Sequence, residues 1–158
     1  MSAENREHSI LKDSNIHAKH ALHHAPPPAL MSASTITGDN VYNNENEDLG
    51  KIKDIVLDLS NGRISYAVLS SGTFLGLGEK LFAVPWSALT LDAENKCFVL
   101  NVDKDEFKLD PGFDKDKWPD MADKKWELNS HNYYKATPYD EGSHTGKADG
   151  NFVFYKSR

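Results

Sequence analysis

Residues 52–70 read IKDIVLDLSNGRISYAVLS, and this stretch decides the fold class. In its first half Ile55, Leu57 and Leu59 recur at every second position, which predicts that they share one face of a β-strand. The turn sequence Ser-Asn-Gly comes next at 60–62, and Asn-Gly favours a hairpin because both residues tolerate a positive φ. The stretch therefore predicts two antiparallel strands joined by a tight turn.

The returning strand is apolar on both faces from Tyr66 to Leu69, which indicates that both of its faces are buried. Outward from this hairpin, short apolar stretches recur between turn signals at the spacing of about 8–12 residues that is typical of all-β proteins. We expect about six short strands, drawn from residues 35–37, 41–42, 52–59, 64–69, 81–84, 89–91 and 97–102. Closure into a small β-barrel would remove the exposed edges of such a sheet.

The composition shows that part of the 158-residue chain is not core, because only 39 % of it is apolar, against about 45–50 % in ordinary globular domains. We divide the chain into a disordered His- and Pro-rich arm, a barrel domain, an aromatic-rich extension that packs on the barrel and a mostly irregular tail, at 1–33, 34–104, 105–135 and 136–158 respectively. Whether Phe152–Tyr155 in the tail adds a strand or docks loosely is left open.

The extension is predicted to be partly helical. Residues 105–109 are expected to form one helical turn, and Asp120 is expected to cap a second helix that runs through Trp126 and Tyr133. Large apolar groups are too frequent here for a solvated tail, so we expect them to pack on the outside of the barrel; they are Phe107, Phe113, Trp118, Met121 and Trp126.

Two stretches of the chain resemble the PRC-barrel family. The first runs from Asp48 through the hairpin to Ser70, and the second, FLGLGEKLFAVPW at 74–86, is similar to the family's glycine loop, lysine and strand ending in Pro-Trp. The resemblance covers roughly residues 34–102, and residues 111–119 look like the segment after the barrel in stand-alone bacterial members. It implies a small PRC-type β-barrel related to the cytoplasmic domain of the photosynthetic reaction-centre H subunit and to a domain of a ribosome-maturation factor.

For function, the resemblance implies protein–protein docking by a non-catalytic module, without a cofactor. The expected partner-binding residues are Phe74, Leu75 and Leu77, with Lys80 directly after the loop. Since the three apolar residues alternate poorly, they cannot all point into one barrel interior, and exposed apolar tips are common binding anchors. We also expect a homodimer, because a barrel of about 70 residues seldom supplies a sufficient core alone.

The sequence contains no convincing catalytic motif. The glycine loop departs from the phosphate-loop pattern, since Glu79 separates Gly78 from Lys80 and a strand rather than a helix comes next. Ser70-Ser71 lies in neither a Gly-x-Ser-x-Gly nor a Ser-x-x-Lys context. We therefore expect that the protein is not an enzyme.

Two other functions stay open. His17, His20 and His24 would share one side of a helix and could bind a metal such as zinc or nickel. An accessory role in RNA or ribosome processing is the other. The net charge of −6, and ten acidic against six basic residues in 34–104, disfavour direct nucleic-acid binding.

Two features favour a cytoplasmic protein without a membrane span. No apolar run approaches the roughly 18 residues that a span needs, and the start of the chain has no apolar signal core. The single cysteine, Cys97, cannot form an internal disulfide and suits a reducing compartment.

Overall fold

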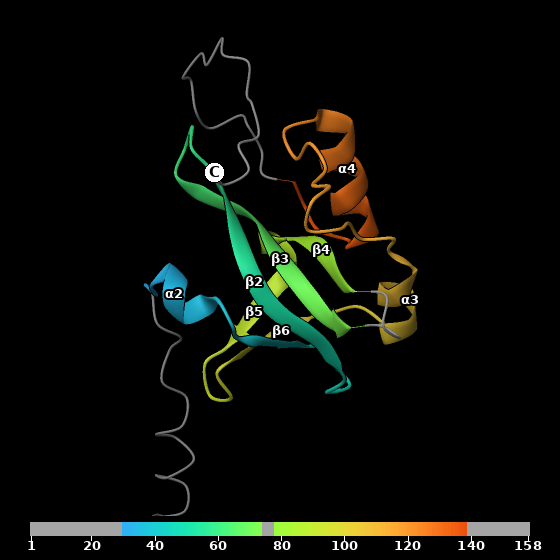
Figure 1. Ribbon diagram of the computed structural model, residues 1–158. Helices are drawn as coiled ribbons and strands as arrows, with labels where there is room; N and C mark the ends of the chain where they lie inside the picture. The colour runs from blue at the N-terminus through green and yellow to red at the C-terminus, as the bar shows by residue number, and fades with distance from the viewer. Residues whose placement is uncertain (1–29, 74–77, 139–158) are drawn as a thin grey trace, which may run out of the picture.

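The strands form one six-stranded sheet in the order β4-β3-β2-β1-β6-β5. This is a computed structural model, which describes residues 30–73 and 78–138. The elements are α2 (Ala33–Ile36), β1 (Asn40–Tyr42), β2 (Asp48–Asp58), β3 (Arg63–Thr73), β4 (Glu79–Pro85), the 3-10 turn η1 (Trp86–Ala88), β5 (Leu89–Asp92), β6 (Cys97–Leu100), α3 (Lys104–Leu109) and α4 (Lys124–Tyr133). The sheet curls, so that β5 and β6 lie behind β2 and β3 (Figure 1). The expected fold class, a small all-β barrel of about six strands with a partly helical C-terminal extension, is confirmed. The expected closure is not complete, because the described strands form a curled half-barrel in which β4 and β5 do not pair.

The curl depends on β1, which pairs antiparallel with β2 and parallel with β6. This short strand joins the first hairpin to the last one, and a side-chain hydrogen bond from Asn44 Nδ2 to Asn101 Oδ1 (2.7 Å) ties the same two regions. The strands at the two ends of this order, β4 and β5, are the edges of the sheet.

Strand β3 is buried on both faces, as its sequence predicts. Ala67 and Leu69 face the interior of the curled sheet, while Tyr66 and Val68 face outward, and none of the four is more than 3 % exposed. The outer face is covered by the C-terminal extension, which contributes Met121 together with the half-buried side chains of Phe113, Trp118 and Trp126. The two-sided apolar pattern of β3 thus reflects a second, smaller core outside the barrel.

Phe107 corrects the expectation that the aromatic residues of the extension all pack outside. It lies in the interior core, with its ring centroid 4.7 Å from that of Phe82. Helix α3 begins at the Asp103 cap, three residues after the end of β6, and it is the helix that carries Phe107 into this core. The other helix, α4, begins later than expected, because Asp123 and not Asp120 accepts the hydrogen bond from Trp126 N (2.8 Å).

Two further expectations were wrong. Residues 35–37 are not a strand; they belong to α2 and its C-cap, because the Ser32 side chain caps the backbone N–H of Thr35. Leu57 and Leu59 do not share a buried face with Ile55. Register shifts between Ile52 and Asp54 and between Val56 and Leu57 break the alternation of β2.

Candidate interaction surface

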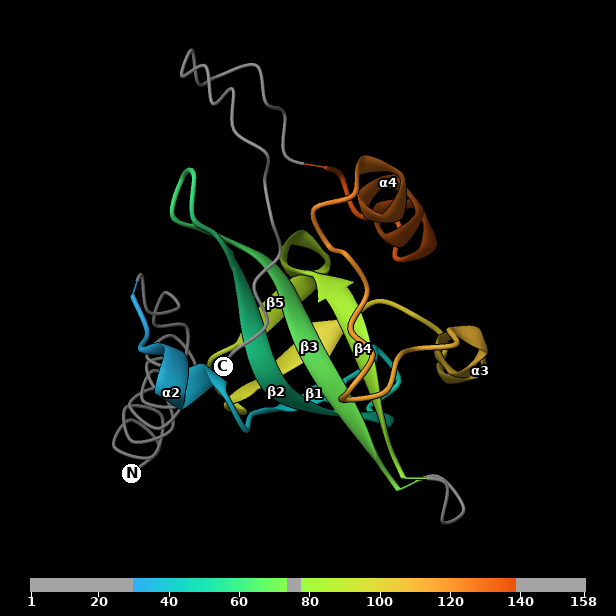
Figure 2. The same ribbon diagram turned by 45° about the horizontal axis from the view of Figure 1, so that its top comes forward.

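The predicted docking loop joins β3 to β4 at the end of the sheet opposite the β2–β3 turn (Figure 2). Phe74, Leu75 and Leu77 lie outside the described residues. The described ends of the loop are held together, because Thr73 and Glu79 are paired across the two strands.

Glu79 anchors the base of this loop to two neighbouring strands. Its carboxylate accepts hydrogen bonds from Ser70 Oγ in β3 and from Lys53 Nζ in β2. The bonds from Lys53 and Ser70 hold the pKa of Glu79 below its ordinary value, because they favour the charged carboxylate. The base of the loop is therefore a platform fixed across β2, β3 and β4.

Lys80 is the one predicted partner-binding residue that the structure describes. Its Nζ lies 3.6 Å from Asp114 Oδ1, and its side chain is 45 % exposed. Because neighbouring residues of a strand point to opposite faces, Glu79 contacts the hairpin while Lys80 contacts the extension. The ammonium group is thus partly engaged within the chain and partly open to solvent.

A cavity of about 270 Å³ lies between β4, the segment 110–119 and α4, and sequence reasoning missed it. Most of its wall is apolar or aromatic; the residues are Ala83, Asp110, Pro111, Gly112, Phe113, Lys117, Pro119, Trp126, Asn129, Ser130, Tyr133 and Tyr134. The spacing of Trp126, Tyr133 and Tyr134 places them on one helix face, and this aromatic face is the sequence feature that could have indicated the cavity. Nothing in the sequence indicates that this face lies against β4.

Tyr134 closes one side of the cavity. Its hydroxyl donates to Asp110 Oδ2 at 2.5 Å, which links α4 to the end of α3. Burial, and then the nearby negative charge of Asp110, raise the pKa of Tyr134, so the phenol stays protonated. This contact fixes the wall of the cavity and leaves little of the Asp110 carboxylate for other bonds.

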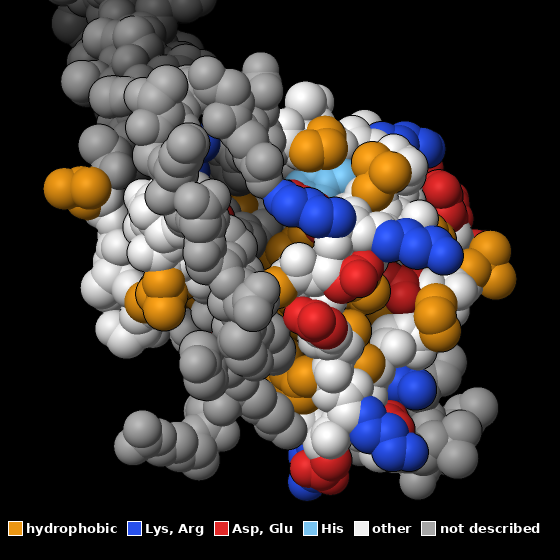
Figure 3. Space-filling model, turned by 90° about the horizontal axis from the view of Figure 1, so that it is seen from above, with side chains coloured by type: hydrophobic (Ala, Val, Ile, Leu, Met, Phe, Trp, Pro, Cys, Tyr) orange, Lys and Arg blue, Asp and Glu red, His pale blue; other side chains and the backbone are white. Residues whose placement is uncertain are grey.

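Exposed apolar side chains form a second feature of the surface. Leu57 and Leu59 at the β2–β3 turn are 53 % and 84 % exposed, and Leu128 on α4 is 53 % exposed. In Figure 3 the hydrophobic side chains of the visible face are separate spots among charged groups, and they do not merge into one patch. Single exposed leucines are ordinary on protein surfaces, so they mark no interface by themselves.

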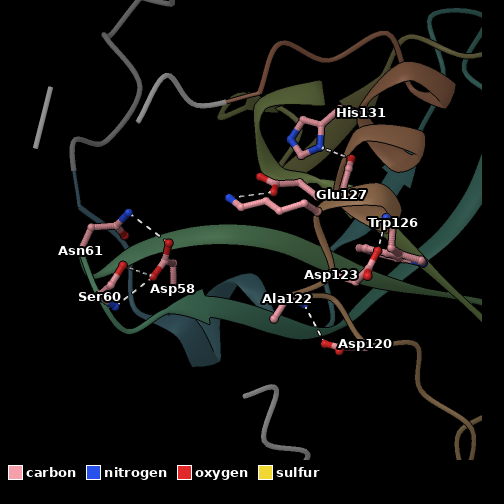
Figure 4. A network of polar contacts seen from close by, with 10 residues as sticks. Asp58, Ser60, Asn61, Asp120, Ala122, Asp123, Trp126, Glu127 and His131 are labelled. Carbon is pink, nitrogen blue, oxygen red and sulfur yellow. Dashed lines mark hydrogen bonds and ion pairs between the residues drawn. The ribbon is translucent and has the colours of Figure 1, made fainter. Parts of the chain in front are cut away.

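The polar contacts near this face are local and structural (Figure 4). Asp58 accepts hydrogen bonds from Ser60 Oγ (2.6 Å) and Asn61 Nδ2 (3.1 Å), which stabilise the hairpin turn. On α4, His131 Nδ1 donates to Glu127 O at 2.8 Å, and the ring lies against Tyr66, 5.8 Å between centroids. These side chains stabilise a turn and a helix.

The structure bears on the possible metal site and on membrane spans only in the residues that it describes. His17, His20 and His24 lie outside the described residues. Among the described residues, no three His, Cys, Asp or Glu side chains gather in a way that could hold a metal ion. In the same part of the chain, no helix combines the length and apolar character that crossing a membrane requires.

Comparison with known proteins finds a matching family model and matching solved structures. The family model described as the PRC-barrel domain matches residues 28–107. Among the solved structures that match is RimM from Pseudomonas aeruginosa, described as a putative 16S ribosomal RNA processing protein; it is 16 % identical with a TM-score of 0.33, and the match covers 51 % of this chain and 50 % of that one. This chain therefore spans about half the length of that protein. No curated protein matches the sequence.

Proposed function

This chain belongs to the PRC-barrel family, and on that premise we propose that it is a non-catalytic docking module that binds a protein partner through the loop between β3 and β4. The partner-binding residues would be Phe74, Leu75 and Leu77, with Lys80 at the edge of the interface. The first interaction of this kind would be with a second copy of the chain, since we expect a homodimer.

The observation that carries the proposal is the clamp at the base of the loop. Glu79 binds Lys53 of β2 and Ser70 of β3, so the loop starts and ends on a fixed platform. A binding loop whose ends are fixed loses less conformational entropy on association than one whose ends move. Apolar residues on a loop that a rigid scaffold positions are common binding anchors.

Single substitutions in the loop test the proposal. We expect Phe74→Ser and Leu77→Ser to keep the unfolding midpoint of the wild-type protein and to weaken both self-association in sedimentation and capture of a partner from the lysate of the host. Leu59→Ser is the matched control, because Leu59 is an equally apolar loop residue at the other end of the sheet and is 84 % exposed.

Two outcomes would contradict the proposal. Unfolding of either loop variant would show that the loop covers the core, and the docking surface would then lie elsewhere. Co-sedimentation of the protein with ribosomal particles that persists in Phe74→Ser would favour the accessory role in RNA or ribosome processing. Direct contact with RNA would have to overcome the acidic balance of residues 34–104.

A further inference from the structure

Part of the outer edge of β4 makes no backbone hydrogen bonds to the described residues. Leu81 makes a two-bond bridge with the extension: its N–H donates to Phe113 O (3.0 Å) and its carbonyl accepts from Phe113 N (2.8 Å). The N–H and C=O groups of a strand point alternately to its two sides, and the pairing of β4 with β3 is regular from Leu81 to Pro85. The N–H and C=O of Ala83 therefore point outward as well, in the direction that Leu81 uses.

Ala83 lies at the cavity, and none of the described residues makes a hydrogen bond to its outward groups. Ala83 is only 6 % exposed, so these groups are largely shielded from bulk water. Ser130 Oγ, from the opposite wall, is also buried without a hydrogen-bond partner in the described structure. Buried polar groups are nearly always paired, so this cavity offers a donor and acceptors to an occupant.

The other free strand edges are less suited to receive a strand. The half of β2 that extends beyond β1 carries two register shifts and the charged Lys53 and Asp54, features that blunt an edge against pairing. Strand β5 has four residues, and none of them lines the cavity. The edge of β4 combines open backbone groups with aromatic walls.

We propose that the β4 edge at Ala83 is a strand-addition site, filled by the C-terminal segment Phe152–Tyr155 of the same chain, whose backbone continues the bridge that Phe113 begins. In strand addition, backbone hydrogen bonds supply affinity and side-chain pockets supply specificity. The proposal concerns the β4 edge and does not depend on the loop at Phe74.

Size and chemistry favour this occupant. An apolar cavity of about 150 Å³ holds a benzene ring, so the 270 Å³ here accommodates one aromatic side chain of the segment. The segment is Phe-Val-Phe-Tyr and carries no charge, which matches walls made of Phe113, Trp126 and Tyr133.

The position of Pro138, where the described chain ends, also favours the segment Phe152–Tyr155 as the occupant. Ser87 Oγ in η1 donates to Thr137 O (3.3 Å), so the described chain ends at Pro138 close to η1, which directly follows β4. Residues 139–151 separate Pro138 from the segment, and an extended chain covers about 3.3 Å for each residue. That length is ample for a return to β4.

Hydrogen exchange of the full-length protein, measured amide by amide by NMR, tests the proposal. In the wild-type protein the Ala83 N–H should exchange slowly. The double substitution Phe152→Ser, Phe154→Ser should accelerate it at least about tenfold, the factor that corresponds to the net worth of one hydrogen bond. The amide of Phe82, which points to β3, should not change. The matched control is His144→Ser, in the same tail but outside the segment.

Three results would overturn the proposal. Fast exchange at Ala83 in the wild-type protein would show that nothing fills the edge. Slow exchange that the double substitution leaves unchanged would assign the site to a different occupant. Protection that disappears when the protein is diluted would identify the segment of a second copy as the occupant.

Discussion

Gly112 holds the contact that fastens the extension to the barrel, and its replacement by alanine should cost about 3 kcal/mol of folding free energy. Gly112 has a φ of +56°, and an added Cβ would lie 2.5 Å from the carbonyl oxygen of Leu81 and 3.0 Å from Cε1 of Phe82. The oxygen belongs to the backbone of β4, so it cannot move aside as a flexible side chain would. The substitution must therefore displace the segment that carries Phe113.

The magnitude comes from two contributions. An L-residue at this φ costs about 1–2 kcal/mol, offset in part by about 0.4–1 kcal/mol because alanine restricts the unfolded chain. Displacement of the segment also weakens the two hydrogen bonds between Leu81 and Phe113, each with a net worth of about 0.5–1.5 kcal/mol. Together these contributions give a loss of about 3 kcal/mol.

Gly62→Ala is the matched control, because Gly62 also has a positive φ, +73°, but an added Cβ would meet no atom within 4 Å. It should cost about 1 kcal/mol. Urea unfolding followed by circular dichroism measures both variants. If Gly112→Ala and Gly62→Ala differ by less than about 0.5 kcal/mol, the close approach to Leu81 does not stabilise the fold and the reasoning is wrong.

The packing, the clamp and the expected dimer each give a further prediction. Met121 is 6 % exposed, so Met121→Ala should destabilise the protein by about 2–5 kcal/mol, and an unchanged unfolding midpoint would show that the extension is not part of the fold. The pKa of Glu79 is lowered in the folded protein, so the carboxylate stabilises the fold above its ordinary pKa of 4.5, and this contribution is lost as the pH falls through the folded pKa. The difference in unfolding free energy between the wild-type protein and Glu79→Gln should therefore shrink in that acidic range and stay constant above it. A difference that does not vary with pH would show that the bonds from Lys53 and Ser70 to Glu79 do not stabilise the fold. Light scattering at micromolar concentration should give about twice the 17.7 kDa of the single chain, and a purely monomeric solution would exclude the homodimer.

The sequence was sufficient for those elements whose pattern reflects local geometry. The run Tyr66–Leu69 predicted a strand buried on both faces, and the Asn61-Gly62 turn predicted a hairpin; both are confirmed. The sequence-based predictions failed where a second structural preference outweighed the local pattern. The bulges of β2 turned Leu57 and Leu59 to solvent, and a serine cap made 35–36 helical.

The candidate site could be predicted only in part, because its key contacts join distant parts of the chain. The pair of Glu79 with Lys53 and the pair of Lys80 with Asp114 each depend on how the sheet curls and on where the extension lies. Neither can be deduced from spacing. The cavity at Ala83 is formed by β4, the segment 110–119 and α4, and no sequence periodicity relates these three segments to one another. Only the α4 wall has a recognisable sequence pattern, because its aromatic residues lie on one face of a helix.

The parallel pairing of β1 with β6 has a consequence for how the chain reaches this fold. Val41 pairs with Phe98, so the sheet cannot complete its curl until nearly two thirds of the chain has been synthesised. The outer face of β3, which carries Val68 and Tyr66, is covered later, because Met121 and Trp126 must be synthesised first. During synthesis an apolar strand is therefore exposed for the time that about sixty more residues take, several seconds at about 5–20 residues per second. Over that interval the nascent chain is a substrate for chaperones, and a stop anywhere between 100 and 120 would release a barrel with an uncovered, aggregation-prone flank.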